Sequence, residues 1–235
     1  MGVGDEKMTV KQRVAKFVEE NYDKQKALFD ASTISSDYKL MGVKTPNLIS
    51  FAKKLVKDGV QYNELPKRNH EEILISGLFI AFCKAPAEEK VEYIKEYLTY
   101  VDNWATCDLV SAKLVNLEDQ QAFFEQLLTS TKPYDVRFAV VWFKRFVLKN
   151  DVRGTVNLIN KSVKCTDYYV EMALAWIYCE ALLLDYDYML KWVQKLARYV
   201  IRNRTLSKAC DSYRTTPEQK KEIRALRSKL LGIEI

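Results

Sequence analysis

The sequence predicts an all-α protein whose helices stack as antiparallel hairpins, forming an α-solenoid with a concave basic cleft. Apolar residues recur at spacings of three and four along nearly the whole chain, and no stretch of strand length alternates strictly. The 235 residues include 7 glycines and 5 prolines, about half the usual share, whereas a β-sandwich or barrel needs many turn residues. We therefore expect one domain spanning residues 1–235, with residues 1–8 flexible.

The first half of the chain carries helix-start and helix-end signals at the expected places. Thr45-Pro46 puts a capping hydroxyl before a proline at the first helical position, and Asn69 precedes two first-turn glutamates. Asp58-Gly59 is typical of a helix end. The helices expected here are Met8–Tyr22, Lys24–Ser35, Pro46–Lys57, Glu71–Lys84, Ala87–Thr99, Trp104–Val115 and Glu118–Leu128.

In the second half, Thr216-Pro217 repeats the capping device, and Gln219 completes a capping box. The most apolar stretch is interrupted by Glu171 and Glu180 and is shorter than the ~20 residues of a membrane span, so it predicts a core helix and no membrane partner. The helices expected here are Tyr134–Lys149, Val152–Ser162, Tyr168–Leu183, Tyr186–Arg202, Leu206–Asp211 and Pro217–Leu231.

The net charge of +6 is concentrated in the second half of the chain. Residues 1–131 hold 17 Lys and Arg against 20 Asp and Glu, whereas residues 132–235 hold 20 against 11. A basic half suggests a polyanionic partner, and nucleic acid is favoured over a membrane because no basic amphipathic anchor is evident. The alternative is a solvated face that only aids solubility.

Several kinds of catalytic site are excluded by the residues that are missing. His70 is the only histidine, so no metal site with two imidazoles can form. No nucleophile elbow, Walker A motif or G-x-G-x-x-G fingerprint occurs, and we expect no metal, cofactor or nucleotide. The odd number of cysteines, four of which lie in apolar helical patterns, and the lack of a signal peptide indicate buried thiols in a reducing cytoplasm. The cysteines are Cys83, Cys107, Cys165, Cys179 and Cys210.

The segment Asp102–Asp108 is the most unusual in the chain. On a helix, Trp104 and Asp108 are four residues apart and project from one face. An ordinary half-buried tryptophan at a helix start is the alternative interpretation. Arg137 near a helix start opposes the macrodipole, which hints at another role. Trp176 lies in an apolar helix, where a plain core position is the alternative.

Taken together, these segments resemble the AlkD-like family of DNA alkylation-repair glycosylases. The matching segments are Tyr38–Pro46, Asp102–Asp108, Val136–Ala139, Tyr168–Trp176 and Asn203–Arg214. They occur in the family's order and cover roughly residues 35–230. The resemblance implies a solenoid of HEAT-like repeats that grips duplex DNA in its cleft and excises alkylated purines such as 3-methyladenine and 7-methylguanine.

The family's site residues fall by motif position on Asp108, Trp104, Trp176 and Arg137. The resemblance implies that Asp108 stabilises the deoxyribose as it becomes cationic, and that the tryptophan faces add cation–π attraction. Arg137 would hold a phosphate beside the lesion. Where family members often carry an arginine one turn beyond the second tryptophan, this chain has Cys179.

The family is also thought to hold the sugar-phosphate against the cleft without enclosing the base, which implies that bulky adducts are tolerated. A cationic base leaves without a general acid, so neutral lesions should be poor substrates.

Basic residues of the second half are candidates to neutralise phosphates. Lys144, Arg145, Lys149, Arg202, Arg204, Lys208 and Arg214 form this set. Lys208 and Arg214 lie inside a matching segment, and Lys44 is a further candidate beside the expected helix start at Pro46. The expected partner is double-stranded DNA containing alkylated bases, bound by a monomer. Two alternatives stay open, namely a non-catalytic helical-repeat protein that binds damaged or branched DNA, and a protein-interaction scaffold.

Overall fold

The computed structural model describes residues 8–231, and all regular elements in that range are helical. The α-helices are α1 Val10–Glu20, α2 Lys24–Thr33, α3 Thr45–Lys57, α4 His70–Phe82, α5 Ala87–Leu98, α6 Trp104–Ser111, α7 Gln121–Leu128, α8 Pro133–Phe146, α9 Val152–Ser162, α10 Tyr168–Leu184, α11 Tyr186–Gln194, α12 Tyr199–Asp211 and α13 Pro217–Leu231. Two 3₁₀ helices, η1 Tyr62–Glu64 and η2 Glu118–Gln120, complete them. The sequence predicts that residues 1–8 are flexible. Of these, residues 1–7 lie outside the described residues.

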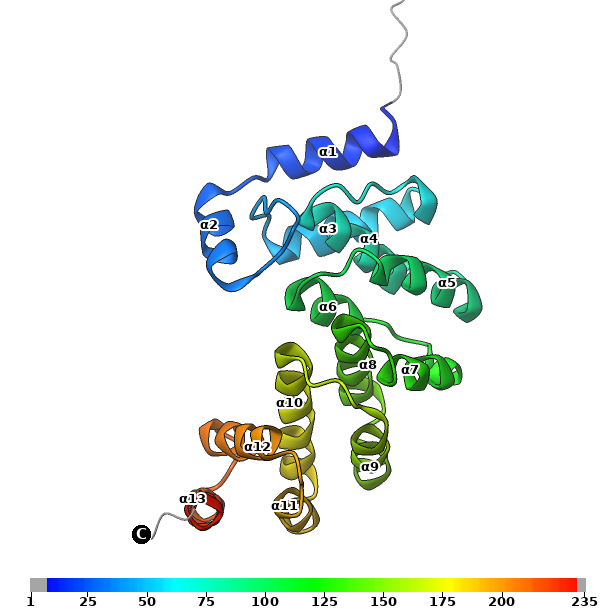
Figure 1. The fold of residues 1–235 in the computed structure, drawn as a ribbon. Coiled ribbons are helices and arrows are strands. Elements are labelled where there is room, and N and C mark those ends of the chain that lie inside the picture. The colour runs from blue at the N-terminus through cyan, green and yellow to red at the C-terminus, as the bar shows by residue number, and fades with distance from the viewer. Residues whose placement is uncertain (1–7, 232–235) are drawn as a thin grey trace, which may run out of the picture. The chain divides into compact units, whose positions relative to one another are not determined.

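The chain forms two compact units, residues 1–121 and 122–235. In the first unit, α4 is the central helix and packs against α3, α5 and α6 (Figure 1). Every residue from His70 to Ala81 is buried. A helix with neighbours on all sides must be apolar all round, which is why this segment lacks a polar stripe.

In the second unit, α10 is the central helix and packs against α8, α9, α11 and α12 (Figure 1). Beside it, Trp142 of α8 is fully buried and stacks on Phe124 of α7 with ring centroids 3.8 Å apart. The packing of helices on their chain neighbours in each unit confirms the predicted all-α helical-repeat solenoid. The concave basic cleft and the single domain stay predictions.

The sequence placed one helix break wrongly. The expected helices Tyr186–Arg202 and Leu206–Asp211 are replaced by α11, which ends at Gln194, and α12, which begins at Tyr199. The connection is fixed by Arg198, whose guanidinium donates to the carbonyl oxygen of Cys165 at 2.8 Å. Leu196 in this connection is buried, so the helical spacing of apolar residues continues from α11 into α12. The spacing therefore gave no signal of the break between the two helices.

Two of the predicted helix caps are confirmed and one is wrong. The Asn69 side chain accepts the N–H of Glu72, and Thr216 and Gln219 form both bonds of a capping box. Thr45 does not cap α3, because the helix begins one residue earlier than expected and Lys44 is its N-cap. The Lys44 carbonyl already accepts the first helical bonds.

The predicted burial of the thiols is confirmed in part. All five cysteines are free thiols, and Cys107, Cys179 and Cys210 are buried. Cys83 and Cys165 are half-exposed because each lies where its helix or loop reaches the surface.

Alanine at Gly42 is expected to destabilise the protein more than alanine at Gly59. Both glycines have positive φ, 70° and 75°, which costs an alanine roughly 1 kcal/mol. A Cβ on Gly42 would also lie 2.3 Å from the carbonyl oxygen of Asp23, whereas nothing lies within 4 Å of one on Gly59. We expect Gly59→Ala to lose about 1 kcal/mol and Gly42→Ala at least about 2 kcal/mol in urea unfolding. Equal losses would show that the turn at Gly42 adjusts without strain.

Candidate functional site

Trp104 and Asp108 lie one turn apart on α6, as their spacing predicts. The start of α6 is fixed by the side chain of Asn103, whose oxygen accepts the N–H groups of Ala105 and Thr106 at 3.0 and 3.1 Å. The indole N–H of Trp104 donates to the carbonyl oxygen of Thr33 at 3.0 Å, which sets the plane of the ring. Trp104 and Asp108 are both half-buried and line the same cavity, while their roles stay predictions.

This cavity, which we call the α6 cavity, has a volume of about 270 Å³ and lies among α2, α3, α4 and α6. Its lining residues are Lys26, Asp30, Ile34, Val43, Thr45, Leu48, His70, Glu71, Leu74, Trp104, Ala105, Asp108 and Leu109. Three helices begin at its wall, at Thr45, His70 and Trp104. Helix N-termini carry partial positive charge, so they favour the ionised form of carboxylates placed nearby.

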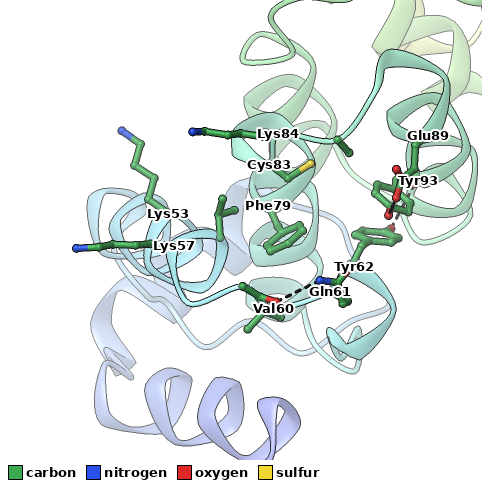
Figure 2. Close-up of a pocket in the computed structure, with 13 residues that line it drawn as sticks. Lys53, Lys57, Val60, Gln61, Tyr62, Phe79, Cys83, Lys84, Glu89 and Tyr93 are labelled. Carbon is green, nitrogen blue, oxygen red and sulfur yellow. Dashed lines mark hydrogen bonds between the residues drawn. The ribbon is translucent and has the colours of Figure 1, made fainter.

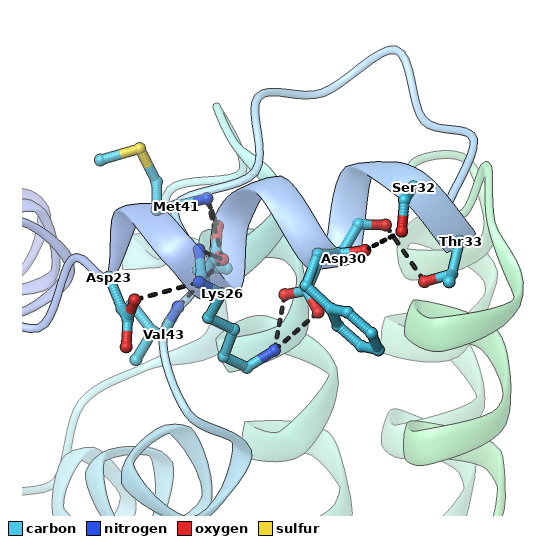
Figure 3. Close-up of polar contacts among 10 residues, drawn as sticks. Asp23, Lys26, Asp30, Ser32, Thr33, Met41 and Val43 are labelled. Atoms are coloured by element: carbon cyan, nitrogen blue, oxygen red, sulfur yellow. Dashed lines mark hydrogen bonds and ion pairs between the residues drawn. The ribbon is translucent and has the colours of Figure 1, made fainter.

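Lys26 and Asp30 form an ion pair on the α2 wall of the cavity. The Lys26 ammonium group lies 2.6 and 2.8 Å from the two carboxylate oxygens of Asp30 (Figure 3). Asp30 is buried, and the two residues are one helical turn apart. The positive charge of Lys26 is therefore matched within its own helix before any ligand approaches.

Glu71 holds the loop that leads into α3. Its buried carboxylate accepts the N–H groups of Met41, Gly42 and Val43 at 2.9, 2.7 and 3.4 Å. The left-handed conformation of Gly42 turns successive N–H groups toward one anion. Burial raises the pKa of Glu71, and these hydrogen bonds oppose that effect. Because Val43 lines the cavity, Glu71 fixes one of its walls.

His70 joins the start of α4 to the cap of α6. The imidazole is buried, and the Nδ2 amide of Asn103 lies 3.4 Å from its Nδ1. Burial lowers the pKa of His70 to about 4, against the opposing effect of Asp102 and Asp30. The ring is therefore neutral at pH 7 and can accept the amide proton.

In the second unit, the predicted residue Trp176 is 40% exposed on α10, so the alternative of a plain core position is wrong. The Lys144 ammonium group lies 3.8 Å from the centroid of the indole. Burial raises the pKa of Cys179 to about 11, while Lys208, Arg214 and Lys144 act to lower it. These three cations therefore lie close to the stretch of α10 that carries Trp176 and Cys179.

Arg137 is less accessible than its predicted phosphate contact suggests. Only 7% of the residue is exposed, and its Nη1 donates to the carbonyl oxygen of Tyr169 at 2.6 Å. This hydrogen bond ties α8 to the first turn of α10. The predicted role of Arg137 in DNA binding stays a prediction.

Of the remaining predicted cations, Arg202, Arg204 and Lys208 are half-buried and the others are more exposed. Arg145 on α8 and Lys44 at the start of α3 are both exposed. Arg214 follows α12 and forms an ion pair with Glu180 of α10, with nitrogen–oxygen distances of 2.8 and 3.0 Å. Trp104, Asp108 and Lys44 belong to the first unit, and Trp176 and the other predicted residues belong to the second.

A second, larger cavity of about 660 Å³ lies at the other end of α4 (Figure 2). Lys53, Lys57 and Lys84 project along one side of it, and Tyr93 stacks on Tyr62 along the other, with ring centroids 4.4 Å apart. The sequence did not single out this cavity, because its residues come from unrelated segments.

Residues 8–231 contain neither a candidate metal site nor a helix suited to span a membrane. No cluster of His, Cys, Asp and Glu in this range is arranged to hold a metal ion. None of the described helices is both long and apolar enough to cross a membrane.

Four cavity residues were missed by the sequence interpretation, namely Lys26, Asp30, His70 and Glu71. The i,i+4 spacing of Lys26 and Asp30 is a signal of an ion pair, although such pairs are common on helices. Glu71 was interpreted only as a first-turn acid, since its partners lie some thirty residues away. No local pattern could have found this contact.

The comparison with known families decides which class of protein this is. The sequence profile of the family described as DNA alkylation repair enzyme matches residues 14–212. The chain belongs to this family. No curated protein sequence matches the chain. Membership confirms the resemblance inferred from the five segments and supports a role in DNA alkylation repair. The matched span includes Trp104, Asp108, Arg137 and Trp176.

Because of His70, the free energy of unfolding is expected to decrease as the pH is lowered from 6.5 to about 4. Because the folded-state pKa lies below the ordinary value of 6.5, the unfolded chain takes up a proton in this window that the folded chain does not. The loss reaches about 3 kcal/mol near pH 4. Since His70 is the only histidine, its imidazole resonance in an NMR titration reports the pKa directly.

The matched control is His70→Gln, which keeps a polar side chain without a titrating ring. Its unfolding free energy in urea should fall less than that of the unchanged protein between pH 7 and about pH 4.5. The same loss in both proteins would assign the pH dependence to the carboxylates instead.

Proposed function

We propose that this DNA alkylation repair enzyme is a glycosylase that hydrolyses the N-glycosidic bond of cationic alkylated purines in duplex DNA. Its expected substrates are 3-methyladenine and 7-methylguanine. The observation that carries the proposal is that Trp104 and Asp108 line one cavity, so that an aromatic ring and a carboxylate can act on the same group. A carboxylate beside an indole is suited to stabilising developing positive charge.

The reaction needs few protein groups because the leaving base is already cationic. As the bond from C1′ to the purine nitrogen breaks, the purine keeps the bonding electron pair and departs neutral. Positive charge builds on the deoxyribose, where the carboxylate of Asp108 would stabilise it. The oxygen of a water molecule then bonds to C1′. That water loses one proton to the solvent near Asp108.

The surroundings of Asp108 favour this role. Asp108 lies one helical turn from the start of α6, on the face that carries Trp104. The hydrogen bond from Trp104 to Thr33 fixes the indole, so the ring needs no reorganisation when charge develops. Asp108 and Trp104 would therefore present a carboxylate and an aromatic ring that are already in position before charge develops on the sugar.

The basic residues of the second unit would bind the DNA backbone. Lys144 lies near the exposed indole of Trp176, Lys208 acts electrostatically on Cys179 of the same helix, and Arg145 is exposed on α8. Contacts of this kind neutralise phosphates and carry no sequence information. Arg214 would have to exchange its ion pair with Glu180 for a phosphate.

A second candidate is a non-catalytic protein that binds damaged or branched DNA. It is favoured by Cys179, a buried thiol at the position where family members often carry an arginine. The family match supports either DNA function over a protein-interaction scaffold.

Asp108→Asn is expected to lower the rate of 7-methylguanine release from methylated duplex DNA by about 100- to 1,000-fold, because the neutral amide cannot stabilise the cationic sugar. DNA binding should stay within about twofold, since the carboxylate contributes little to phosphate contacts. Release of free base, measured by chromatography, and binding, measured by fluorescence anisotropy, check both expectations.

The matched control for this substitution is Asp119→Asn, at an exposed carboxylate on η2. It should leave both release and binding unchanged. Binding of methylated DNA by the unchanged protein without any base release would support the non-catalytic candidate. If the unchanged protein neither bound methylated DNA nor released free base, the protein-interaction scaffold would be the remaining alternative.

Lys208→Met is expected to reduce the salt dependence of DNA binding, because each lost phosphate contact lowers the slope of log K against log salt by about 0.9. Lys191→Met is the control, at an exposed lysine of α11 that lies outside the matching segments. Binding measured across a series of salt concentrations gives both slopes. Equal slopes for the two variants would remove Lys208 from the DNA-binding surface.

A further inference from the structure

We propose that the second cavity, at the end of α4 away from the α6 cavity, is a docking site for an acidic peptide segment of a partner protein. One aromatic side chain of the segment would fill the cavity, and carboxylates next to it in the segment would bind the lysines on one side. The inference does not depend on the proposed glycosylase function and adds an interaction surface to the first unit.

The size and apolar lining of the second cavity suit one large side chain. Its volume of about 660 Å³ lies within the range of roughly 300–1,000 Å³ typical of ligand pockets. Its lining includes the buried residues Val60, Tyr62 and Phe79 and the half-buried residues Val56 and Ala85. A phenyl or indole ring placed against these residues would be removed from water, which favours binding.

The lysines of the cavity form no ion pairs within residues 8–231. Lys53 and Lys57 come from α3, and Lys84 follows the end of α4 (Figure 2). All three are exposed, and none is bound to a carboxylate in the described part of the chain. Lys57 also stabilises the C-terminal end of α3, and the Lys53 ammonium group lies 4.9 Å from the centroid of the Phe82 ring. This positive cluster lies in the half of the chain that is otherwise net negative.

Two carboxylates close to these lysines in the sequence have other partners. Asp58, next to Lys57, forms an ion pair with Arg13 of α1. Glu89 lines the opposite side of the cavity and accepts a hydrogen bond from the hydroxyl of Tyr93 (Figure 2). The lysines can therefore bind an external anion without first breaking an ion pair.

An acidic peptide suits this arrangement better than a nucleic acid does. Nucleic acids need positive charge that follows the phosphate backbone. Here the lysines lie on one side of the cavity, and Glu89 on the opposite side would repel a second phosphate. A peptide can instead place an apolar side chain and several carboxylates within a few residues. Buried aromatic anchors and complementary charge are typical of protein recognition.

The second cavity is separate from the site of the proposed chemistry. The α6 cavity includes His70 at the start of α4, whereas the second cavity includes Phe79 and Cys83 at the other end. The 13 residues of α4 span about 20 Å. A peptide bound at the second cavity would therefore not occupy the α6 cavity.

The first experiment measures peptide binding to the full chain by isothermal titration calorimetry, without DNA. The probe is a blocked synthetic peptide in which one phenylalanine is flanked by aspartates. Two control peptides replace the phenylalanine with alanine or the aspartates with asparagine. We expect either replacement to weaken binding by about tenfold or more, because the anchor or the charge is lost. Equal binding of the three peptides would overturn the proposal.

Substitutions then test the residues of the cavity. Lys53→Met and Lys84→Met should each weaken binding of the probe by at least about threefold, since each removes one charged contact. Lys54→Met is the matched control, at an exposed lysine of α3 that does not line this cavity, and should leave binding unchanged. Ala85→Leu should weaken binding by about tenfold in a protein with an unchanged circular dichroism spectrum, because it fills the cavity. Equal effects of the Lys54 and Lys84 substitutions would reduce the binding to unspecific charge attraction and refute the site.

Alkylation of thiols locates the bound peptide. Cys83 and Cys165 are both half-exposed, but Cys83 lines the second cavity and Cys165 belongs to the second unit. Saturating probe should slow the reaction of Cys83 with iodoacetamide by about fivefold or more and leave that of Cys165 unchanged. Mass spectrometry measures both rates. Equal protection of the two thiols, or protection of neither, would place the peptide elsewhere.

Two other occupants are tested with the same protein. Loss of Cys83 protection when unmethylated duplex DNA displaces the probe would assign the cavity to nucleic acid. Self-association of the unchanged protein in analytical ultracentrifugation, if abolished by Lys84→Met, would assign it to a second copy of the chain. Either result would overturn the proposal. None of these measurements needs base release, so failure of the docking site and failure of the glycosylase are distinguishable.

Discussion

The start of α4 is the structural constraint on which the first unit depends. Glu71 gathers the N–H groups of Met41, Gly42 and Val43, and the neighbouring His70 meets the amide that caps α6. Three segments that are distant in the sequence are thereby fixed around one helix end. Without the buried carboxylate, three backbone N–H groups would be left unsatisfied, and each such group is costly in a protein interior.

The α6 cavity follows from this arrangement. Because α3, α4 and α6 all begin at its wall, the cavity is lined by polar residues of these helices as well as by Leu48, Leu74 and Leu109. The positive ends of the helices favour carboxylates, and the chain places Asp30, Glu71 and Asp108 there. Asp30 pairs with Lys26, Glu71 accepts three backbone N–H groups, and Asp108 lies one helical turn from the indole of Trp104. One set of electrostatic conditions thus serves both folding and the proposed chemistry.

The second unit uses charge differently. Around α10, Arg204 and Arg214 form ion pairs with Glu171 and Glu180 of this helix, and the ammonium group of Lys144 lies beside the exposed ring of Trp176. An exposed indole beneath an ammonium group is stabilised by cation–π attraction and presents both an apolar and a positive surface. Such a surface suits a sugar-phosphate backbone. In the proposed function, the positive charge of residues 132–235 would bind the polyanion, and the first unit would supply the carboxylate.

The sequence by itself determined the helical class, most helix positions and the family, because periodic burial and capping are local properties that leave a local pattern. It also brought Trp104 and Asp108 together, since four residues on a helix define one face. It could not find the break before Tyr199, where a buried connection continues the apolar spacing. The α6 cavity, the clamp made by Glu71 and the burial of Arg137 were decided only by the tertiary structure. They depend on contacts between segments about thirty or more residues apart, which no local pattern encodes.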